Sequence, residues 1–407
     1  MRIRWRAIAV LAALLLVGAA CGDDGQTGED GGTEGEPIRI GISLPLTGDF
    51  SQPGGEAKRG YEIWRDLTND AGGLLGRPVE LVILDDASSQ DTVVSDYQRL
   101  IDQENVDLLL GTFSSLLNLP ASAVAERNQM VYVEPAGGAP EMFDRGFEYL
   151  FFAQQATAPH QADMFAQWVL SLPEGERPTT AAYPTQDDPF AAPVIDGIRQ
   201  QLEAGGITTV YKSVYPPETT NFDTIAADIQ ASDAELVAQG AVFEDGVGLV
   251  RSFQRIDYNP ATLFQTSAPS NSDQYAKGIG PENTEGIFYA VSWHQDTDTP
   301  MNAEFVAAYQ AQYDSIPAED AADAFATAQV LQTAVEAVGE IDQTAIKDYL
   351  HANEVETVLG TLSWDETGAP QQAFLLAQWQ GDQAEIVLPE EVATTDTIVN
   401  PKPDWAS

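Results

Sequence analysis

The sequence predicts an α/β protein made of two doubly wound, Rossmann-like lobes. Apolar runs of strand length alternate with helical patterns, and this alternation occurs twice along the chain. The apolar runs are continuous, as expected for parallel strands that are covered on both faces. A chain of 407 residues is also long enough for two separate cores.

The first unit begins with an apolar run at 38–44, IRIGISL. The helical patterns that follow each have one apolar face; in the first helix it contains Tyr61, Trp64 and Leu67. Tyr149–Phe152 is expected to be a short strand that leaves this unit. The other expected strands are 38–44, 79–84, 107–110 and 130–133, and the expected helices are 55–69, 92–103 and 118–128.

The alternation restarts near residue 160 and predicts the second unit. Strands are expected at 180–183, 208–215, 236–238 and 263–265, and helices at 160–172, 193–204, 222–231 and 247–256. The stretch 286–292 is expected to cross back toward the first unit. Residues 301–353 are expected to be mostly helical, with strands at 360–364 and 374–380. Two such units joined by extended segments imply two lobes with a cleft between them. The predicted boundaries are 38–154 with 295–355 for lobe 1, and 155–294 with 356–407 for lobe 2.

The amino terminus has the features of a secretion signal. Three arginines precede the apolar run Ala7–Ala20, which is too short to span a bilayer. The run ends in Val17-Gly18-Ala19-Ala20-Cys21, which resembles a bacterial lipoprotein cleavage site and predicts lipidation of Cys21. The alternative is an ordinary signal peptide with an incidental cysteine. Residues 1–21 are therefore the expected signal peptide, and residues 22–37 an acidic, glycine-rich, disordered tether.

The composition excludes several classes of partner and chemistry. The chain has 63 acidic and 19 basic residues, and its net charge of −44 disfavours nucleic acid as a partner. With one cysteine it forms no intrachain disulfide. The three histidines are far apart and have no metal-ligand spacing. No metal and no cofactor are expected.

The stretch Val106–Pro140 is the most informative part of the chain. Two apolar runs each end in small or hydroxyl residues, at Gly111–Ser115 and Pro135–Gly138. In an open parallel sheet, ligands bind outside the carboxyl ends of the strands. Serine hydroxyls and N–H groups at a helix start favour an anion, and glycine allows a ligand close to the backbone. Ordinary strand-to-helix turns use the same residues, so both interpretations stay open.

An ordered set of motifs gives a family resemblance. The set is Pro45-Leu46-Thr47-Gly48, Gly72-Gly73-Leu74-Leu75-Gly76-Arg77, Asp85-Asp86, Glu134-Pro135-Ala136 and Leu362-Ser363-Trp364-Asp365. In this order the motifs resemble the branched-chain amino-acid (leucine/isoleucine/valine) type of extracellular solute-binding protein of ABC transporters. The resemblance covers the chain from about Ile38 to its end. It implies the type I periplasmic-binding fold, with a three-crossover hinge that closes around a solute.

The resemblance also implies contact residues in lobe 1. The serine of the loop after the third strand matches Ser115, with Ser114 beside it. The next loop matches Pro135 to Gly138, of which Ala136, Gly137 and Gly138 are the expected contacts. In the family these loops hold a ligand carboxylate through N–H and hydroxyl groups, and here Gly138 lacks the usual hydroxyl.

In lobe 2, the family's aromatic contacts match Phe190 and Phe243. The acidic residue that pairs with the ligand's ammonium matches Ser267, and a buried ammonium without a carboxylate is costly. Either another carboxylate replaces it, or the ligand has no α-ammonium. The candidate replacements are Glu134, Asp187, Asp188 and Glu244.

Two further contacts are expected in lobe 1. Phe50 lies on the first loop, where relatives also contact the ligand, although simple packing is the alternative. Glu134 follows an apolar strand and either points at the cleft or faces solvent at the strand end.

No catalytic motif is present: the sequence has no G-x-S-x-G, H-E-x-x-H, P-loop or G-x-G-x-x-G. We therefore expect a binding protein, not an enzyme. It would be a monomer, lipid-anchored outside the cytoplasm, that binds a small polar solute such as an amino acid or a related carboxylate or amide. It would deliver the solute to an ABC permease in the membrane. The alternatives are a sensory module of the same fold and a secreted hydrolase.

Overall fold

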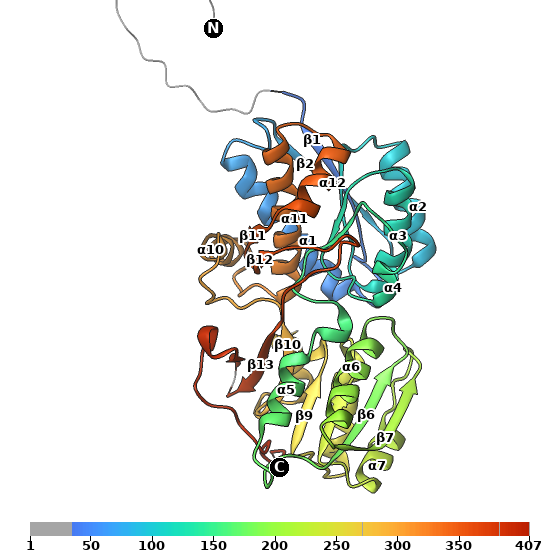
Figure 1. The fold of residues 1–407 in the computed structure, drawn as a ribbon, viewed down its shortest axis with the longest axis vertical. Coiled ribbons are helices and arrows are strands. Elements are labelled where there is room, and N and C mark those ends of the chain that lie inside the picture. Colours follow the sequence, from blue (N-terminus) through green and yellow to red (C-terminus); the bar gives the residue numbers. More distant parts are fainter. Residues whose placement is uncertain (1–34, 271, 382, 407) are drawn as a thin grey trace, which may run out of the picture. The chain divides into compact units, whose positions relative to one another are not determined.

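The computed structural model describes residues 35–270, 272–381 and 383–406, so the expected signal peptide and Cys21 lie outside the described part. The described residues form two α/β lobes, each with its own sheet (Figure 1). This confirms the predicted fold class. Within these residues, no helix is both long and apolar enough to cross a bilayer.

Lobe 1 contains a five-stranded sheet in the order β2-β1-β3-β4-β5, and all of its strand pairs are parallel. The strands are β1 (Ile38–Leu44), β2 (Val79–Asp85), β3 (Leu108–Leu110), β4 (Tyr132–Glu134) and β5 (Leu150–Phe152). The helices that connect them are α1 (Ser51–Asp70), α2 (Gln90–Asp102), α3 (Ser115–Arg127) and α4 (Pro140–Phe143).

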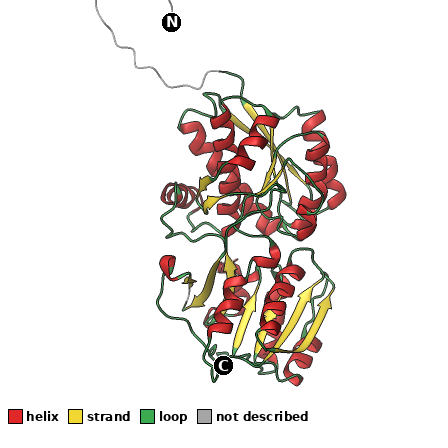
Figure 2. Ribbon diagram, viewed as in Figure 1, coloured by secondary structure: helices red, strands yellow, loops and turns green. Residues whose placement is uncertain are grey.

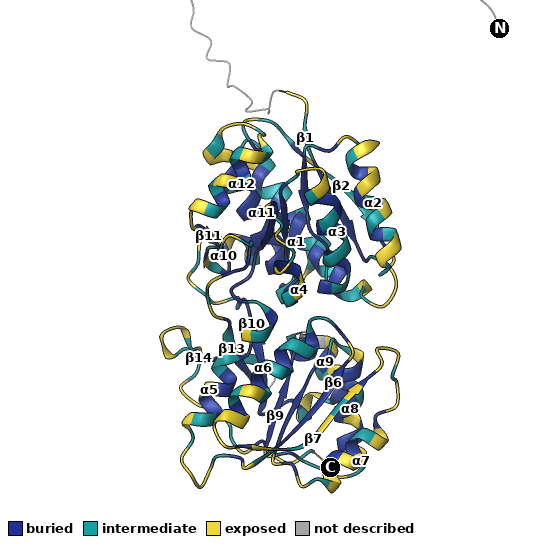
Figure 3. Cartoon of the chain, turned by 45° about the vertical axis from the view of Figure 1, so that its right-hand side comes forward, coloured by how far each residue is buried: buried dark blue, intermediate teal, exposed yellow. Residues whose placement is uncertain are grey.

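Both faces of this sheet are buried, which explains why its strands are continuously apolar. In β3, Leu108 and Leu110 belong to the core beneath α1, whereas Leu109 belongs to the core beneath α2 and α3. Figure 2 shows helices on both sides of the sheet, and Figure 3 shows the strands buried between them. A strand with alternating polarity would leave one of these cores unfilled.

The chain returns to lobe 1 after β10, the last parallel strand of the second sheet. The returning elements are α10 (Asn302–Tyr313), α11 (Glu319–Val338), α12 (Gln343–Ala352) and the antiparallel hairpin β11 (Val355–Thr357) and β12 (Gly360–Leu362). Val355, Leu362 and Trp364 are buried in the same core as β1, so they belong to lobe 1. The predicted boundary between residues 355 and 356 is therefore wrong. Ala369 still packs in a lobe 1 core, so the crossing lies after it.

Lobe 2 contains a seven-stranded sheet in the order β14-β13-β10-β9-β8-β6-β7, in which β13 and β14 run antiparallel to their neighbours. The strands are β6 (Thr180–Gln186), β7 (Thr208–Tyr215), β8 (Leu236–Gln239), β9 (Thr262–Gln265), β10 (Ile287–Val291), β13 (Leu375–Gln380) and β14 (Gln383–Leu388). The helices are α5 (Asp163–Ser171), α6 (Ala191–Ala204), α7 (Asp223–Ala231), α8 (Glu244–Arg255) and α9 (Ser272–Ile279).

Gln155 connects the three segments that cross between the lobes. It lies on the first crossover, and its side-chain amide donates to Ser292 O on the second at 2.7 Å. The same amide donates to Leu359 O at 3.2 Å. On the third crossover, Gln372 N donates to Gln155 O at 2.7 Å. Gln155 is 5% exposed, so these bonds are sheltered from water.

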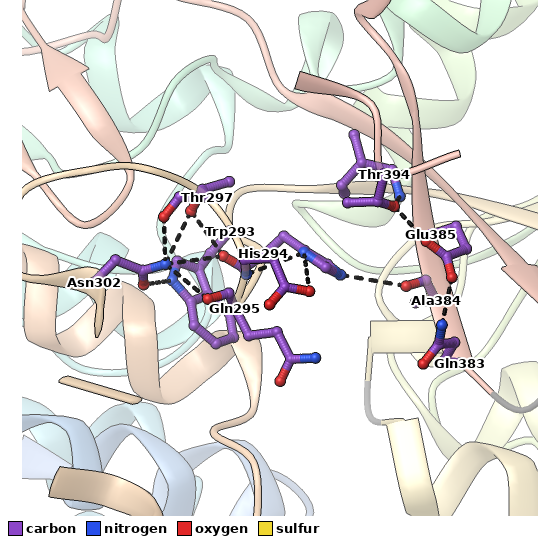
Figure 4. Close-up of polar contacts among 11 residues, drawn as sticks. Trp293, His294, Gln295, Thr297, Asn302, Gln383, Ala384, Glu385 and Thr394 are labelled. Atoms are coloured by element: carbon purple, nitrogen blue, oxygen red, sulfur yellow. Dashed lines mark hydrogen bonds and ion pairs between the residues drawn. The ribbon is translucent and has the colours of Figure 1, made fainter. Parts of the chain in front are cut away.

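Asn302 fixes the second crossover to the start of α10 (Figure 4). Its Oδ1 accepts from Trp293 Nε1 at 2.6 Å. Its Nδ2 donates to the carbonyl oxygens of His294, Gln295 and Thr297 at 3.3, 3.0 and 2.9 Å. One buried amide therefore satisfies the backbone of a segment that has no regular partner.

His294 links this crossover to the end of lobe 2's sheet (Figure 4). Its Nε2 lies 3.3 Å from Ala384 O in β14, and its Nδ1 accepts from Asp296 N at 3.3 Å. The ring therefore bridges the crossover and the antiparallel edge.

We predict that Gly60→Ala destabilises the protein by about 1–3 kcal/mol. Gly60 packs against α11, and a Cβ there would lie 2.0 Å from Ala321 O, a backbone atom. The matched control is Gly55→Ala on the same helix, where a Cβ would meet nothing within 4 Å. That control should gain about 0.5–1 kcal/mol from helix propensity. Urea unfolding measures both, and equal effects would contradict the close packing of α1 on α11.

Candidate functional site

The loops after β3 and β4 lie at the same edge of lobe 1's sheet, because the strands are parallel neighbours. A hydrogen bond joins the loops directly: Ala139 N donates to Ser115 Oγ at 3.1 Å. Ser115 is fully buried, and its hydroxyl therefore supports the second loop. The two loops that the sequence analysis singled out therefore lie side by side.

Ser114 differs from Ser115 in the use of its hydroxyl. It precedes α3 with φ of 69°, a left-handed conformation that costs a non-glycine residue energy. Its Oγ is buried and has no hydrogen-bond partner among the described residues. A buried hydroxyl without a partner is unfavourable, so Ser114 is the better of the two candidates for bonding a solute.

Glu134 ends β4 and turns into the protein. It is 0% exposed, which excludes the alternative of a carboxylate facing solvent. Its Oε2 accepts from Ala136 N at 2.8 Å, and its Oε1 has no partner among the described residues. Burial raises the pKa of Glu134 to about 8, against the N–H groups of Ala136 and Gly137 and the charge of Arg145, which lower it.

The loop of Ala136, Gly137 and Gly138 wraps around this carboxyl group. A Cβ at Gly137 would lie 2.5 Å from Glu134 Oε1, so only glycine fits there. Gly138 O accepts from Ala158 N at 2.7 Å and so ties the loop to the first crossover. The N–H of Ala136, expected to be free for a ligand carboxylate, is already bonded to Glu134.

Phe50 begins the first helix and is half-buried. Its ring contacts that of Phe113 edge-on, with centroids 5.6 Å apart, and packs against the core beneath α2 and α3. Both Phe50 and Phe113 therefore have packing roles in lobe 1.

Phe190 and Phe243 flank the facing edge of lobe 2. Phe190 precedes α6 and packs against the core on one face of the sheet, and Phe243 precedes α8 and packs against the core on the other. Asp188 Oδ1 accepts from the N–H groups of Phe190 and Ala191 at 2.8 and 2.9 Å. Asp188 therefore caps the start of α6. Its carboxylate, a candidate partner for a ligand ammonium, is already bonded to this backbone.

Ser267 lies between β9 and a short 3-10 helix, Ala268–Ser270. Its N–H donates to Ala241 O at 3.3 Å, and its O accepts from Ser270 Oγ at 2.8 Å. Ser267 is half-buried, so it stays accessible from one side.

The sequence interpretation missed a buried polar network beneath this edge of lobe 2. Tyr215 Oη donates to Asp245 Oδ2 at 2.7 Å, and Gln239 Nε2 donates to Tyr215 Oη at 2.9 Å. Gln265 Nε2 donates to Gln239 Oε1 at 2.5 Å, and Tyr275 Oη donates to Gln265 Oε1. Gln239 and Gln265 each end an apolar strand, as Glu134 does, and this shared pattern could have identified them.

Asp245 connects the network to the loop before α8. Its Oδ1 accepts from Val242 N at 3.0 Å and from Phe243 N at 3.2 Å. Burial raises its pKa, and the bond from Tyr215 is the main opposing cause. The network therefore fixes the backbone that carries Phe243.

Two cavities lie near these edges, and none of the ten predicted contact residues lines either. The larger, of about 820 Å³, is lined mainly by α6 and residues 187–189. The other, of about 570 Å³, lies by the starts of α1 and α11 and the second crossover. It is lined by Gln52, Glu56, Glu319, Trp293 and Trp379, among others. No acidic, histidine or cysteine cluster in the described residues could hold a metal ion.

We predict that Glu134→Gln changes how stability depends on pH. The pKa of Glu134 is raised from 4.5 to about 8, so the native state favours the protonated acid. This contribution is fully present below pH 4.5 and is lost as pH rises to about 8, by on the order of a few kcal/mol.

Glutamine accepts the same hydrogen bond but does not ionise. The melting temperature of the variant minus that of the wild type should therefore increase from pH 5 to pH 8. Scanning calorimetry at matched salt measures it, and a constant difference would show that Glu134 ionises normally in the native state.

Residues 37–384 match the model of the family described as "Periplasmic binding protein". A Leu/Ile/Val-binding protein homolog 7 from Brucella suis is 26% identical over 96% of this chain and 98% of its own length. The Leu/Ile/Val-binding protein BraC3 of Rhizobium johnstonii is 27% identical over 84% of this chain and 92% of its own.

Solved structures share the fold. The leucine-binding protein LivK of Thermotoga maritima has a TM-score of 0.76 at 20% identity, covering 86% of this chain and 97% of its own. A solute-binding protein from R. palustris in complex with benzoate has a TM-score of 0.76 at 19% identity, covering 91% and 98%. These proteins bind solutes and are not enzymes, which confirms the expectation of a binding protein over a hydrolase. The chain belongs to the periplasmic binding protein family, as a member of its branched-chain amino-acid type.

Proposed function

We propose that this protein is a lipid-anchored, extracytoplasmic receptor that binds a small polar solute between its lobes for an ABC permease. The observation that carries the proposal is the unpaired, buried hydroxyl of Ser114 in the described structure. This hydroxyl has no hydrogen-bond partner in the described part of the chain, and it lies at the carboxyl edge of the sheet beside the loop after β4. A solute that bonds this hydroxyl satisfies it.

Further support comes from the relatives and the hinge. The curated relatives are named Leu/Ile/Val-binding proteins, and solved neighbours bind isoleucine or benzoate. The solute is therefore proposed to be an amino acid or a related carboxylate or amide. Hinge closure requires that the solute binds one arrangement of the lobes more tightly than the other. The crossovers joined through Gln155 are the proposed pivot.

The ten predicted residues divide into proposed solute contacts and residues that support the site. Ser114, Phe190, Phe243 and Ser267 are proposed to contact the solute, since each is at least partly exposed and lies at a facing edge. Ser115, Glu134 and the loop from Ala136 to Gly138 shape the site from beneath. Phe50 positions the first loop through Phe113. The protein is proposed to act as a monomer.

We predict that a solute from a screen of amino acids, amides, carboxylates and aromatic acids raises the melting temperature of residues 33–407. A solute that binds only the native state adds about 2.7 kcal/mol of stability at a hundred times its dissociation constant. Ser114→Ala should weaken binding of that solute at least severalfold by titration calorimetry, without loss of stability.

The matched control is Ser115→Ala. It leaves the buried Ala139 N without an acceptor and should cost about 1–3 kcal/mol of stability. A protein that binds no solute in the screen is not the proposed receptor. Unchanged affinity in Ser114→Ala would remove Ser114 from the site.

We also predict that Cys21 anchors the protein. In a bacterial host that lipidates secreted proteins, the wild type should partition into detergent and yield an acylated amino-terminal peptide by mass spectrometry. Cys21→Ser should appear in the aqueous phase. Retention of Cys21→Ser in the detergent phase would show that the anchor is not the lipid.

A further inference from the structure

Glu134 lies between the two loops of the proposed solute site in lobe 1. Gly137 belongs to the loop after β4, and a Cβ there would lie 2.5 Å from Glu134 Oε1. Gly111 begins the loop after β3, and a Cβ there would lie 2.2 Å from Glu134 Cβ. Both loops therefore pack directly on this side chain, and any charge that it carries is next to both.

The carboxyl group of Glu134 has fewer partners than an ionised carboxylate needs. It is 0% exposed, and its Oε2 accepts from Ala136 N at 2.8 Å, whereas its Oε1 has no partner among the described residues. A buried carboxylate with an unsatisfied oxygen is costly, and the protonated acid avoids that cost. Burial accordingly raises the pKa of Glu134 to about 8. At neutral pH most molecules therefore hold a proton at this position.

The charged and titratable groups that face Glu134 do not neutralise it. Arg145, after α4, lowers the pKa of Glu134, but its guanidinium donates to Leu119 O at 2.7 Å and forms no ion pair with Glu134 among the described residues. Tyr61 on α1 and Tyr132 on β4 also face this carboxyl group. Burial raises the pKa of both phenols well above 10, so they stay uncharged. An ionised Glu134 would thus place an unpaired negative charge beside both loops.

Helix α11 also packs against β4, and its Asp323 faces the phenol of Tyr61, as Glu134 does. Burial raises the pKa of Asp323 well above its usual value, which disfavours a second negative charge beneath this edge. The charge that the loops experience from below therefore depends chiefly on Glu134.

A neutral Glu134 leaves this edge suited to an anion. Helix α3 begins directly after Ser114, has no acidic residue in its first turn, and offers N–H groups that have no acceptor within the helix. The positive end of the helix favours an anion, and the unpaired hydroxyl of Ser114 can donate to one. An ionised Glu134 would repel the same anion. Protonation of Glu134 is therefore a condition for binding a carboxylate here.

We propose that Glu134 determines which solute charge lobe 1 accepts. When protonated it permits a carboxylate at the loops after β3 and β4, and when ionised it repels one. Glu134 acts through its charge and not through contact, since both of its oxygens are buried beneath the loop of Ala136 and Gly137. The inference rests on the proposed solute-binding function and adds the residue that makes affinity depend on pH.

The direction of the pH effect follows from linkage. A bound carboxylate disfavours the ionised form of Glu134 and raises its pKa above about 8, so the complex holds the proton more firmly than the free protein does. Affinity for the carboxylate is therefore constant below about pH 7, and it falls as pH rises through 8, by up to about tenfold per pH unit.

The test compares the wild type with Glu134→Gln, which keeps an acceptor for Ala136 N but does not ionise. The purified proteins are titrated with leucine, 4-methylpentanoate and benzoate at pH 7 and pH 9 by calorimetry. The ratio of wild-type to variant affinity isolates Glu134, because a titrating solute or another acid of the protein affects both. For the carboxylate that binds best, we expect this ratio to fall about tenfold from pH 7 to pH 9. The matched control is Asp144→Asn, which removes an exposed acid after α4; the ratio of wild-type affinity to its affinity should not change with pH.

A second measurement does not depend on the variant. At pH 8.5, titration of the wild type in two buffers of different ionisation enthalpy should show uptake of most of one proton per bound carboxylate, and at pH 6 it should show none. A ratio that is constant or rises with pH, or binding without proton uptake at pH 8.5, overturns the inference and leaves the proposed function intact. A screen in which only solutes without a carboxylate bind has the same consequence. If neither these probes nor the broad screen shows binding, both the inference and the proposed function fail.

Discussion

The three segments that cross between the lobes are hydrogen-bonded to one another at a single buried residue, Gln155. Its side-chain amide donates to the backbone of the second crossover and of the β11–β12 hairpin, and its main-chain carbonyl accepts from the third crossover. Any relative movement of the lobes must bend these segments close to that residue. The bonds are to backbone atoms, so they constrain where the segments run without depending on neighbouring side chains. Asn302 gives the second crossover the same kind of support on the lobe 1 side.

At the solute edge of lobe 1, the feature that matters is which buried polar atoms have hydrogen-bond partners. Buried N–H groups there are matched by the chain's own oxygens, whereas Ser114 Oγ and Glu134 Oε1 have no partner among the described residues. Lobe 2 shows the opposite condition: Asp245, Tyr215, Gln239 and Gln265 satisfy one another. The edge of lobe 1 therefore has polar atoms without partners, whereas the edge of lobe 2 is already fixed by its own hydrogen bonds. A solute that bonds the free atoms of lobe 1 and also contacts lobe 2 binds more tightly when the two edges are close together, and so favours that arrangement of the lobes.

Much of the fold follows from the sequence, because continuous apolar strands and helical patterns are local signals. The lobe boundary at 355/356 failed because β11 and β12 are short, and only packing against β1 assigns them to lobe 1. Strand β14 was missed because its continuous apolar run, Ile386–Leu388, is only three residues long. The loops holding Ser114 and Ala136 follow neighbouring strands, and a hydrogen bond between Ala139 and Ser115 joins them. The inward turn of Glu134 was not predictable, because it depends on the space that Gly137 leaves.

The return of the chain to lobe 1 has a consequence for the order in which the protein assembles. Trp64 on α1 donates to Gln332 on α11, 268 positions later, at 2.8 Å. The first lobe therefore cannot complete its core until α11 has emerged from a ribosome or an export channel. The second lobe has its whole parallel sheet, from β6 to β10, before that return begins. The half of the molecule that starts the sequence is thus the half whose core is completed last, and until then α1 covers its face of the sheet without α11.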